Sequence, residues 1–318
     1  MQIGMIGLGR MGANMTRRLA RAGIEVIAFD RSPEARTATA GEPGARAVDS
    51  LQELVAALVV PRALWLMLPA GEATESTLAA LQPLLERGDV VVDGANTYYV
   101  DSMRRASMLA ASGIEYADAG VSGGIWGLEN GYALMMGGSE AAIARLEPAV
   151  RALAPAPDRG WLHCGPSGSG HYAKMIHNGI EYGMMQAYAE GFALLDAKRE
   201  FRLDVAKIAE SWRHGSVVRS WLLDLTAEFM RDGHALDNIA PVVADSGEGR
   251  WTALEGIELG IPTPVMSLAL MQRFSSQGKA DYQARLLARM RQAFGGHAVS
   301  TSPAATASAN ATTPVRRA

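Results

Sequence analysis

One stretch of the chain, HYAKMIHNGIEYG (residues 171–183), combines a helical pattern with four polar side chains that exchange protons or hydrogen bonds. Spaced i, i+3, i+4 and i+7, they are Lys174, His177, Asn178 and Glu181. At 3.6 residues per turn this spacing places them within a sector of about 100° of one helix. Lysine, histidine and glutamate can give and take protons, so the face could carry acid–base chemistry. On spacing alone it could equally be a solvated face with an ionic pair.

The elements that must position this face begin with alternating strands and helices. Continuous apolar runs indicate buried strands at 2–7, 24–30, 62–69, 89–95, 114–121, 133–138 and 160–165. Helical patterns lie between them at 10–23, 32–41, 50–58, 74–88, 99–113 and 139–154. This alternation predicts an α/β fold with a doubly wound, mostly parallel sheet of the Rossmann type, covered on both faces. We expect residues 1–168 to form this domain.

The remainder of the chain shows helical patterns and no clear strand. A long pattern opens at Gly168 and contains the polar face, and further amphipathic patterns lie at 204–215, 220–232, 249–260, 264–276 and 281–294. Residues 169–297 are therefore expected to form an all-helical C-terminal domain. Residues 298–318 are rich in small and polar side chains without an apolar period, which predicts a disordered tail.

The bulk composition excludes several classes of protein. The chain has 318 residues, of which 48% are hydrophobic and 20% charged, and its net charge is −3. Such a balance is typical of a globular protein and gives no strong field for nucleic acid or an acidic membrane. The N-terminus has no basic targeting region, and no apolar run reaches the roughly 20 residues of a membrane helix. We expect a cytoplasmic protein.

The cysteine and metal-ligand content gives two further expectations. Cys164 is the single cysteine, so no disulfide can form within the chain and a reducing compartment is favoured. Its neighbours indicate a strand end entering a glycine-rich turn, so we interpret this thiol as structural and not as a nucleophile. No cluster of histidine, cysteine and carboxylates has metal-ligand spacing, and we predict no metal.

The sequence GLGRMG supplies Gly7, Gly9 and Gly12 in the pattern G-x-G-x-x-G, after a predicted strand and at the start of a predicted helix. In this context the first glycine allows the tight turn, the second admits a pyrophosphate, and the third lets helix and strand pack closely. The helix N-terminus then offers N–H groups and a positive dipole end to the anion. A glycine-rich turn without a ligand is the alternative interpretation.

Asp30 ends the second predicted strand, where a carboxylate can accept hydrogen bonds from the adenosine ribose and would repel the 2′-phosphate of NADP. It favours NAD as the cofactor. Arg31 and Ser32 follow it and could bind that phosphate or stack on adenine, so NADP stays possible as a second cofactor. The cofactor site is further predicted to include Leu8, Arg10, Met11, Leu68, Pro69, Ala70 and Asn96.

Four other stretches carry polar or glycine residues, and two of them lie at strand ends, where such a sheet binds ligands. DGANTYY places Asn96 just past a strand end, and AGVSGG places Ser122, Gly123 and Gly124 at another strand end. In the helical part, DSGEGRWT contains Arg250. FGGH contains His297, which lies six residues after Arg291. Together with KMIHNGIEYG these stretches resemble the 6-phosphogluconate dehydrogenase family within the β-hydroxyacid dehydrogenases. The resemblance covers nearly everything from Met1 to His297, and the length is similar to that of the short members.

The resemblance implies roles for individual residues. Lys174 is implied to be the general base and Glu181 the general acid. Substrate contacts are implied for Asn96, Ser122, Gly123, Gly124, His177, Asn178, Tyr182, Arg250, Arg273, Arg291 and His297. Arg250 stands where many members have lysine. The dipeptide before Met11 also differs from that of longer members, but Met11 is still expected near the nicotinamide. In this family the C-terminal arginine and histidine reach into the neighbouring subunit's site, which implies a homodimer or homotetramer.

The implied reaction is oxidative decarboxylation of 6-phospho-D-gluconate to D-ribulose 5-phosphate and CO₂, with reduction of NAD(P)⁺, a step of the pentose phosphate pathway. Lys174 can remove the hydroxyl proton only when it is neutral, and a free lysine has a pKa of about 10.4. Burial or nearby positive charge must therefore lower its pKa. The β-keto acid then loses CO₂, and Glu181 can protonate the resulting enediol. The polar helix face would be a reaction surface.

Two other functions stay open. Another β-hydroxyacid dehydrogenase, such as one acting on 3-hydroxyisobutyrate, shares VSGG and a lysine followed four residues later by asparagine. It would not be expected to carry His177, the Glu181–Tyr182 pair or the set of arginines suited to a phosphate. A dinucleotide-binding module that senses redox state without turnover is the other alternative, and the presence of Lys174 and Glu181 argues against it.

Overall fold

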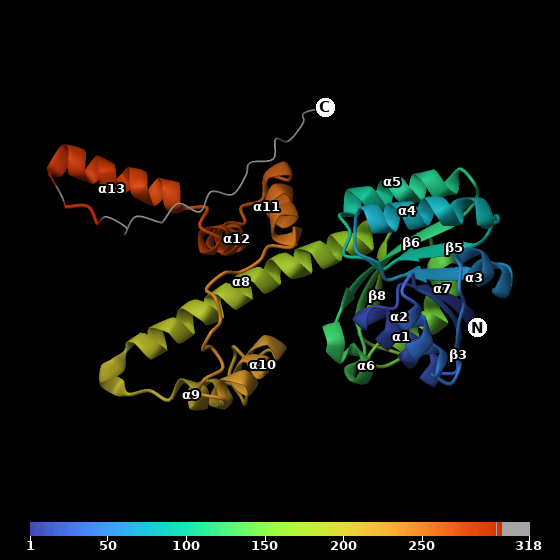
Figure 1. The fold of residues 1–318 in the computed structure, drawn as a ribbon, viewed down its shortest axis with the longest axis horizontal. Helices are drawn as coiled ribbons and strands as arrows, with labels where there is room; N and C mark the ends of the chain where they lie inside the picture. The colour runs from blue at the N-terminus through green and yellow to red at the C-terminus, as the bar shows by residue number, and fades with distance from the viewer. Residues whose placement is uncertain (297, 301–318) are drawn as a thin grey trace. The chain divides into compact units, whose positions relative to one another are not determined.

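The apolar runs of the first half form one eight-stranded sheet in the computed structural model, which describes residues 1–296 and 298–300 (Figure 1). The strands are β1 (Gln2–Ile6), β2 (Glu25–Phe29), β3 (Ala45–Ala47), β4 (Ala63–Leu66), β5 (Val90–Asp93), β6 (Glu115–Ser122), β7 (Ala133–Gly137) and β8 (Trp161–Gly165). Their order across the sheet is β3-β2-β1-β4-β5-β6-β7-β8. Every neighbouring pair is parallel except β6 and β7. The predicted doubly wound, mostly parallel sheet is confirmed.

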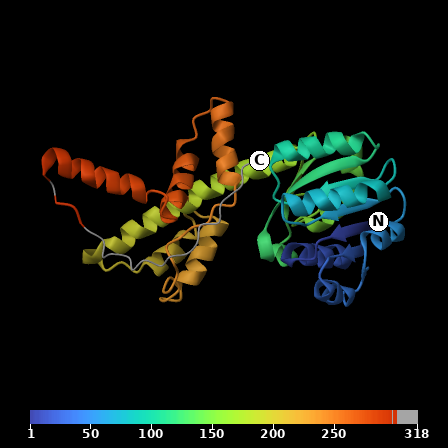
Figure 2. The same ribbon diagram turned by 45° about the horizontal axis from the view of Figure 1, so that its top comes forward.

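Helices cover both faces of this sheet, which explains why its strands are continuous apolar runs. The helices on one face are α1 (Arg10–Arg21), α2 (Pro33–Ala40) and α7 (Glu140–Leu153), and those on the other are α3 (Leu51–Ala57), α4 (Glu72–Leu81) and α5 (Tyr99–Ala110) (Figure 2). Along β2, Val26 and Ala28 belong to the first core and Ile27 to the second. Successive side chains of a strand point to opposite faces, so the central strands carry apolar residues at most consecutive positions.

Some short elements differ from the sequence expectation. Strand β3 was not predicted, because its sequence ARA has no apolar run and lies at the edge of the sheet. The helix expected over 74–88 ends at Leu81 and continues as the 3₁₀ turn η1 (Gln82–Leu84), where Pro83 cannot donate a backbone hydrogen bond. The turns η2 (Gly124–Trp126) and α6 (Gly127–Asn130) are too short to show a period.

The second half of the chain is helical, and within residues 1–296 and 298–300 no strand follows β8. Its helices are α8 (Ser169–Ala197), η3 (Arg199–Phe201), α9 (Val205–Trp212), α10 (Trp221–Met230), α11 (Glu248–Glu258), α12 (Pro264–Ser276) and α13 (Asp281–Gly295). The expected all-helical C-terminal part is confirmed. In the described portion of the chain, no helix has the length and apolar character needed to cross a membrane.

Contacts between Cα atoms divide the chain into two compact units. The first contains Met1–Asp237 and Ser246–Leu270, and the second contains Asn238–Asp245 and the chain from Met271 onward. The sheet, α8 and α11 therefore belong to one unit. The division expected at residues 168 and 169 stays a prediction, and the tail expected at 298–318 lies mostly outside the described residues.

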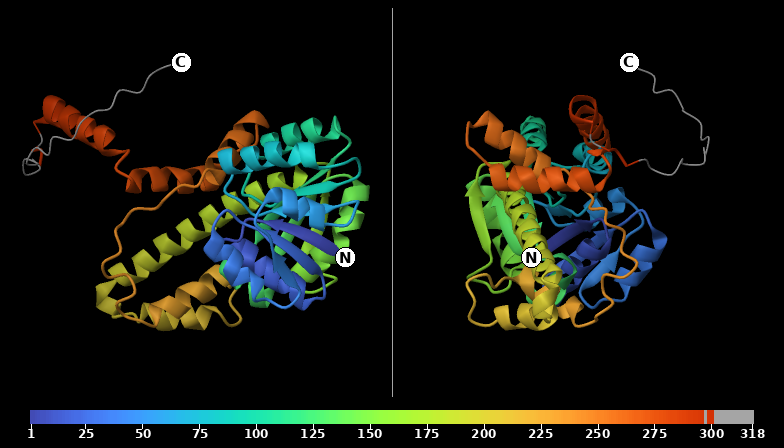
Figure 3. Two further views of the ribbon diagram at one scale, coloured as in Figure 1. Left: turned by 45° about the vertical axis from the view of Figure 1, so that its right-hand side comes forward. Right: turned by 90° about the vertical axis from the view of Figure 1, so that its left-hand side faces the viewer.

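The long helix α8 is fixed against the sheet at its N-terminal end (Figure 3). Asp118 of β6 is fully buried, and its carboxylate accepts the backbone N–H groups of Gly168 and His171 at 2.6 and 2.8 Å. These are N–H groups of the first turn, which have no partner inside the helix. Gly170 faces β6 and β7 so closely that a Cβ there would lie 2.7 Å from the carbonyl oxygen of Asp118. The same strand therefore orients α8 and ends at Ser122.

Candidate functional site

The glycine-rich turn lies at the switch point of the sheet, where β1 is flanked by β2 and β4. Gly7 has φ +93°, and a Cβ on it would overlap the carbonyl oxygen of Met67. A Cβ on Gly12 would overlap the carbonyl oxygen of Gly7, whereas a Cβ on Gly9 would meet nothing within 4 Å. Gly7 and Gly12 therefore allow the turn itself, and the open space at Gly9 fits the approach of a pyrophosphate to the N-terminus of α1.

Asp30 connects this turn to the end of β2. One carboxylate oxygen accepts the N–H of Leu8 at 2.6 Å and the other accepts the N–H of Ser32 at 2.8 Å. These bonds fix the carboxylate next to the turn, and each oxygen keeps a further lone pair for the hydroxyls of a ribose. The residues predicted from the β4–α4 loop, Leu68, Pro69 and Ala70, directly follow the strand that pairs with β1.

Ser32 does not offer a free hydroxyl to a phosphate. Its Oγ accepts the N–H of Ala35 at 3.1 Å as the N-cap of α2 and donates to the carboxylate of Glu34 at 2.7 Å. The hydrogen bond from Ser32 lowers the pKa of Glu34, so this exposed carboxylate is ionised at neutral pH. A second negative charge is thus linked to Asp30 through Ser32. The sequence analysis did not identify Glu34, because an acidic residue in the first turn of a helix has an ordinary explanation in the helix dipole.

The four polar side chains of α8 lie together and meet the end of β6. Ser122 Oγ is 3.3 Å from His177 Nε2, and His177 Nδ1 is 3.0 Å from the side-chain oxygen of Asn178. Lys174 Nζ lies 3.4 Å from His177 Nδ1. The nearest carboxylate oxygen of Glu181 lies 3.9 Å from the same His177 Nδ1. The spacing on the helix therefore does produce one connected polar cluster.

The side chain of Lys174 packs closely against strand β6. A Cβ on Gly120 of β6 would overlap the Cβ of Lys174, so only glycine leaves room for this side chain. Burial lowers the pKa of Lys174, and the carboxylates of Glu181 and Glu248 act in the opposite direction. A lowered pKa makes the neutral amine more accessible, which is the state that a general base requires.

Two asparagines of the predicted site converge on a residue that the sequence analysis did not identify, Glu248. Its Oε1 accepts hydrogen bonds from the side-chain amide nitrogens of Asn96 and Asn178, the second at 3.2 Å. Glu248 begins α11 and is only 4% exposed. In the sequence Glu248 stands between two glycines in DSGEGRWT, ahead of an amphipathic helix. An acidic residue there is ordinarily explained by its favourable interaction with the helix dipole, so the sequence pattern offered no reason to assign it to the site.

Asn96 is itself held by a buried network behind it. Asp93, at the end of β5, accepts the N–H of Ala95 at 3.0 Å, the guanidinium of Arg105 at 2.6 Å and the hydroxyl of Tyr116 at 2.9 Å. Arg105 and Asp93 are fully buried. These bonds fix the loop after β5, so the side chain of Asn96 starts from a rigid backbone.

Other predicted substrate residues of the first unit lie on β6, α8 and α11 or directly after them. Gly123 and Gly124 follow Ser122 with φ values of +130° and +53°, so the backbone turns sharply there. Tyr182 is buried against α11, where a Cβ on Gly249 would lie 2.5 Å from its ring. Arg250 lies on the exposed side of α11.

The remaining predicted phosphate ligands lie in the second unit or beyond. Arg273 donates to the carbonyl oxygen of Ala244 at 2.9 Å, and Arg291 is exposed on α13. His297 lies outside the described residues. That Arg273, Arg291 and His297 bind the substrate stays a prediction.

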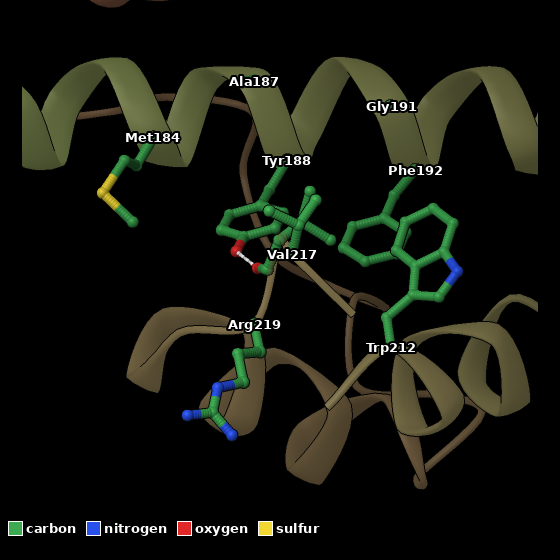
Figure 4. Close-up of a pocket in the computed structure, with 9 residues that line it drawn as sticks. Met184, Ala187, Tyr188, Gly191, Phe192, Trp212, Val217 and Arg219 are labelled. Atoms are coloured by element: carbon green, nitrogen blue, oxygen red, sulfur yellow. Dashed lines mark hydrogen bonds between the residues drawn. The ribbon is translucent and has the colours of Figure 1, made fainter. Parts of the chain in front are cut away.

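A separate apolar pocket of about 370 Å³ lies between α8 and the α9–α10 region (Figure 4). Tyr188 and Phe192 point from α8 toward Trp212 and Val217, and Arg219 lies at the same pocket. It contains none of the predicted site residues and has few polar atoms, so it is not where the acid–base chemistry would occur.

Two sequence expectations concern residues outside the cluster. Burial raises the pKa of the Cys164 thiol, which disfavours the thiolate and agrees with a structural interpretation. Among the described residues, no group of three histidines, cysteines and carboxylates could hold a metal ion.

A glycine-rich turn at the switch point of a doubly wound sheet, with a half-buried lysine and a glutamate on a following helix, is typical of the class of dinucleotide-dependent dehydrogenases. Comparison with known proteins is more specific. The family model described as the NAD binding domain of 6-phosphogluconate dehydrogenase matches residues 2–164, and the one described as the 6-phosphogluconate dehydrogenase C-terminal domain matches residues 170–312. The chain belongs to the 6-phosphogluconate dehydrogenase family, which confirms the resemblance found in its motifs.

Individual relatives agree with this assignment. A Haloferax volcanii protein named 6-phosphogluconate dehydrogenase, NAD(+)-dependent, decarboxylating, is 46% identical over 300 residues, 94% of this chain and 98% of the relative. The structure of Plasmodium falciparum 6-phosphogluconate dehydrogenase, solved apo, with NADP⁺ and with 6-phosphogluconate, matches with a TM-score of 0.81 and 29% identity over 96% of this chain and 67% of that one. A Mycobacterium tuberculosis 3-hydroxyisobutyrate dehydrogenase shares the fold, with a TM-score of 0.65 and 23% identity over 88% of this chain and 94% of that one.

Proposed function

We propose that the protein oxidises and decarboxylates 6-phospho-D-gluconate to D-ribulose 5-phosphate and CO₂, with NAD⁺ as its preferred oxidant. The observation that carries this proposal is the cluster of Lys174, His177, Asn178 and Glu181 joined to Ser122, in a chain of the 6-phosphogluconate dehydrogenase family. The names of its relatives favour this reaction over oxidation of 3-hydroxyisobutyrate. A module that only senses dinucleotides would not need the cluster.

Lys174 acts as the general base in the first step. Its neutral amine takes the proton of the substrate hydroxyl as hydride leaves the same carbon, and bound NAD⁺ supplies the acceptor for that hydride. Burial, which lowers the pKa of Lys174, supports this role. After the transfer the amine is protonated and can polarise the new ketone, which promotes the loss of CO₂ from the β-keto acid.

Glu181 acts as the general acid in the last step. It lies two helical turns from Lys174 on the same face, so the two groups can flank a short sugar acid. The enediol left by CO₂ loss must gain a proton at the carbon that carried the carboxylate, and Glu181 gives it. Ser122, the backbone of Gly123 and Gly124, His177, Asn178, Asn96 and Tyr182 bind the substrate around these two groups.

The turn from Gly7 to Gly12 binds the cofactor pyrophosphate, and Asp30 binds the adenosine ribose. Leu8, Arg10, Met11, Arg31, Ser32, Leu68, Pro69 and Ala70 complete the cofactor site. The carboxylates of Asp30 and Glu34 disfavour a 2′-phosphate, and Ser32 already uses its hydroxyl in two hydrogen bonds. These features support a preference for NAD⁺ over NADP⁺.

The substrate phosphate is bound by arginines and by His297, with Arg291 and His297 contributed by a second copy of the chain. Exposed apolar side chains of the first unit support association of two copies. They include Ile180, Leu194, Val217, Trp221, Leu254, Ile257, Val265 and Leu268. Large apolar side chains that stay exposed in one copy are candidates for burial at a subunit interface. The division of the chain into domains at residues 168 and 169 is part of the same proposal.

The function is tested by following NADH formation with 6-phosphogluconate, gluconate and 3-hydroxyisobutyrate as substrates. We expect turnover with the first, little with the second and none above background with the third. Lys174→Ala should lose nearly all turnover and still bind NAD⁺. Substantial activity of this variant would show that Lys174 is not the base, and a preference for 3-hydroxyisobutyrate would reject the proposed substrate.

Sharing of the site between two copies is tested by mixing two inactive variants. Lys174→Ala damages the base and Arg291→Ala the residue contributed to the neighbour. In a randomised mixture of dimers, half would be hybrids with one intact site, so about a quarter of the wild-type activity should return. No recovery after demonstrated subunit exchange would mean that Arg291 acts within its own subunit.

A further inference from the structure

The buried carboxylate of Glu248 is not explained by the folding of α11. Its Oε2 is buried and has no hydrogen-bond partner within residues 1–296 and 298–300. A buried carboxylate that is only partly satisfied destabilises a fold, and an apolar residue or a glutamine would cost less. The position is also closely packed, because Thr252 on the next turn of α11 donates to the carbonyl oxygen of Met175 at 3.0 Å. Such a carboxylate at a rigid position indicates a functional role.

The chemistry of Glu248 fixes the orientation of two amide groups. An ionised carboxylate can only accept hydrogen bonds. Asn96 and Asn178 must therefore both turn their nitrogens toward it, and their side-chain oxygens face away. The oxygen of Asn178 then points to His177 Nδ1 at 3.0 Å.

The orientation of Asn178 in turn selects one tautomer of His177. Since the oxygen of Asn178 is an acceptor, His177 Nδ1 must carry a hydrogen and donate it. In the neutral imidazole Nε2 is then the acceptor, and the hydroxyl of Ser122 can donate to it at 3.3 Å. The opposite orientation of Asn178 would place the hydrogen of His177 on Nε2.

The tautomer of His177 bears directly on Lys174, whose Nζ lies 3.4 Å from Nδ1. An ammonium group has only donors, so it would meet the N–H of His177 donor to donor. A neutral amine has a lone pair and can accept. We propose that Glu248 is a positioning residue that orients Asn178 and thereby places the hydrogen of His177 on Nδ1, where it faces Lys174 and favours the neutral amine. The negative charge of the same carboxylate acts on Lys174 in the opposite direction, and the uncharged glutamine variant separates the two effects.

This role rests on the proposed function, in which Lys174 is the base, but its central step can be measured without any substrate. Long-range ¹H–¹⁵N correlation spectra of the imidazole nitrogens distinguish the two tautomers at a pH where histidine is neutral, and a His177→Asn variant assigns the signals. We expect the wild-type protein to carry the hydrogen on Nδ1. A hydrogen on Nε2 in the wild-type protein would overturn the proposal, whatever the variants do.

Three variants separate orientation from charge and from simple packing. Glu248→Ala should give a mixture of His177 tautomers and lower kcat by about tenfold or more, because base catalysis is partly lost. Glu248→Gln should keep the Nδ1 tautomer and lose less than about fivefold, since its amide oxygen can still accept from both asparagines. The matched control is Glu255→Ala, which removes another buried carboxylate from α11, one that accepts the hydroxyl of Tyr99 at 2.9 Å. It should leave the tautomer and kcat unchanged.

A double-mutant cycle tests whether Glu248 acts through Asn178. Because Glu248 also holds Asn96, the cycle is run in an Asn96→Ala background, where combining Glu248→Ala with Asn178→Ala should be no slower than Asn178→Ala. Additive losses in kcat, or an unchanged tautomer in Glu248→Ala, would contradict the proposal. If the wild-type protein fails to oxidise 6-phosphogluconate, the proposed function is wrong, and the tautomer measurements still decide the role of Glu248.

Discussion

The contact between Gly120 and Lys174 predicts the cost of a single added methyl group. A Cβ at position 120 would lie 2.8 Å from the carbonyl oxygen of Gly170 and closer still to the Cβ of Lys174, whereas ordinary contacts are 3.4–4 Å. Neither neighbour is the flexible end of a side chain. Gly120→Ala must therefore move α8 away from β6, by about 1 Å at Lys174, and a displacement of that size can lower kcat about 100-fold.

The assay compares kcat and the dissociation constant of NADH in Gly120→Ala and in a matched control. Gly191→Ala lies on the same helix, where an added Cβ meets nothing within 4 Å. It should keep the wild-type kcat and gain up to about 1 kcal/mol of stability from helix propensity. Gly120→Ala should bind NADH normally, because the glycine-rich turn lies elsewhere on the sheet. A wild-type kcat in Gly120→Ala would show that Lys174 does not need its observed position.

The remaining predictions concern pH, the cofactor and the tail. The value of kcat/KM should rise with pH as Lys174 loses its proton. Because burial lowers the pKa of Lys174, this rise should occur at a lower pH than for an ordinary lysine. Glu248→Gln removes a carboxylate that favours the protonated amine, so the rise should move to still lower pH; a shift to higher pH would contradict this electrostatic assignment. Glu34→Gln should improve kcat/KM with NADP⁺ relative to NAD⁺ by about tenfold, as expected for removing one charge near a phosphate, and an unchanged ratio would leave Asp30 as the determinant. Removal of residues 299–318 should leave turnover intact, because their composition carries no packing signal; loss of NADH formation on truncation would refute this.

Much of the fold could be predicted because its signals are local. Strands that are buried on both faces must be continuous apolar runs, as in β4 and β5, and helices between them repeat every 3.6 residues. Gly7 and Gly12 were recognisable from their spacing after a predicted strand. The structure shows why they are glycines, because a Cβ at either position would overlap the backbone. The edge strand β3 was missed because two half-buried alanines on either side of an exposed arginine form no apolar run.

The amino-acid sequence by itself determined the sheet, the cofactor turn and the four polar residues of α8, because spacing along one helix brings them together without help from distant parts of the chain. Only the tertiary structure decided how these groups are held. Gly120 and Glu248 act on Lys174 and Asn178 from other elements, across separations that no periodicity spans. A carboxylate ahead of a helix or a glycine in a strand has an ordinary local explanation in the sequence, and its role becomes visible only when packing shows which side chain it meets.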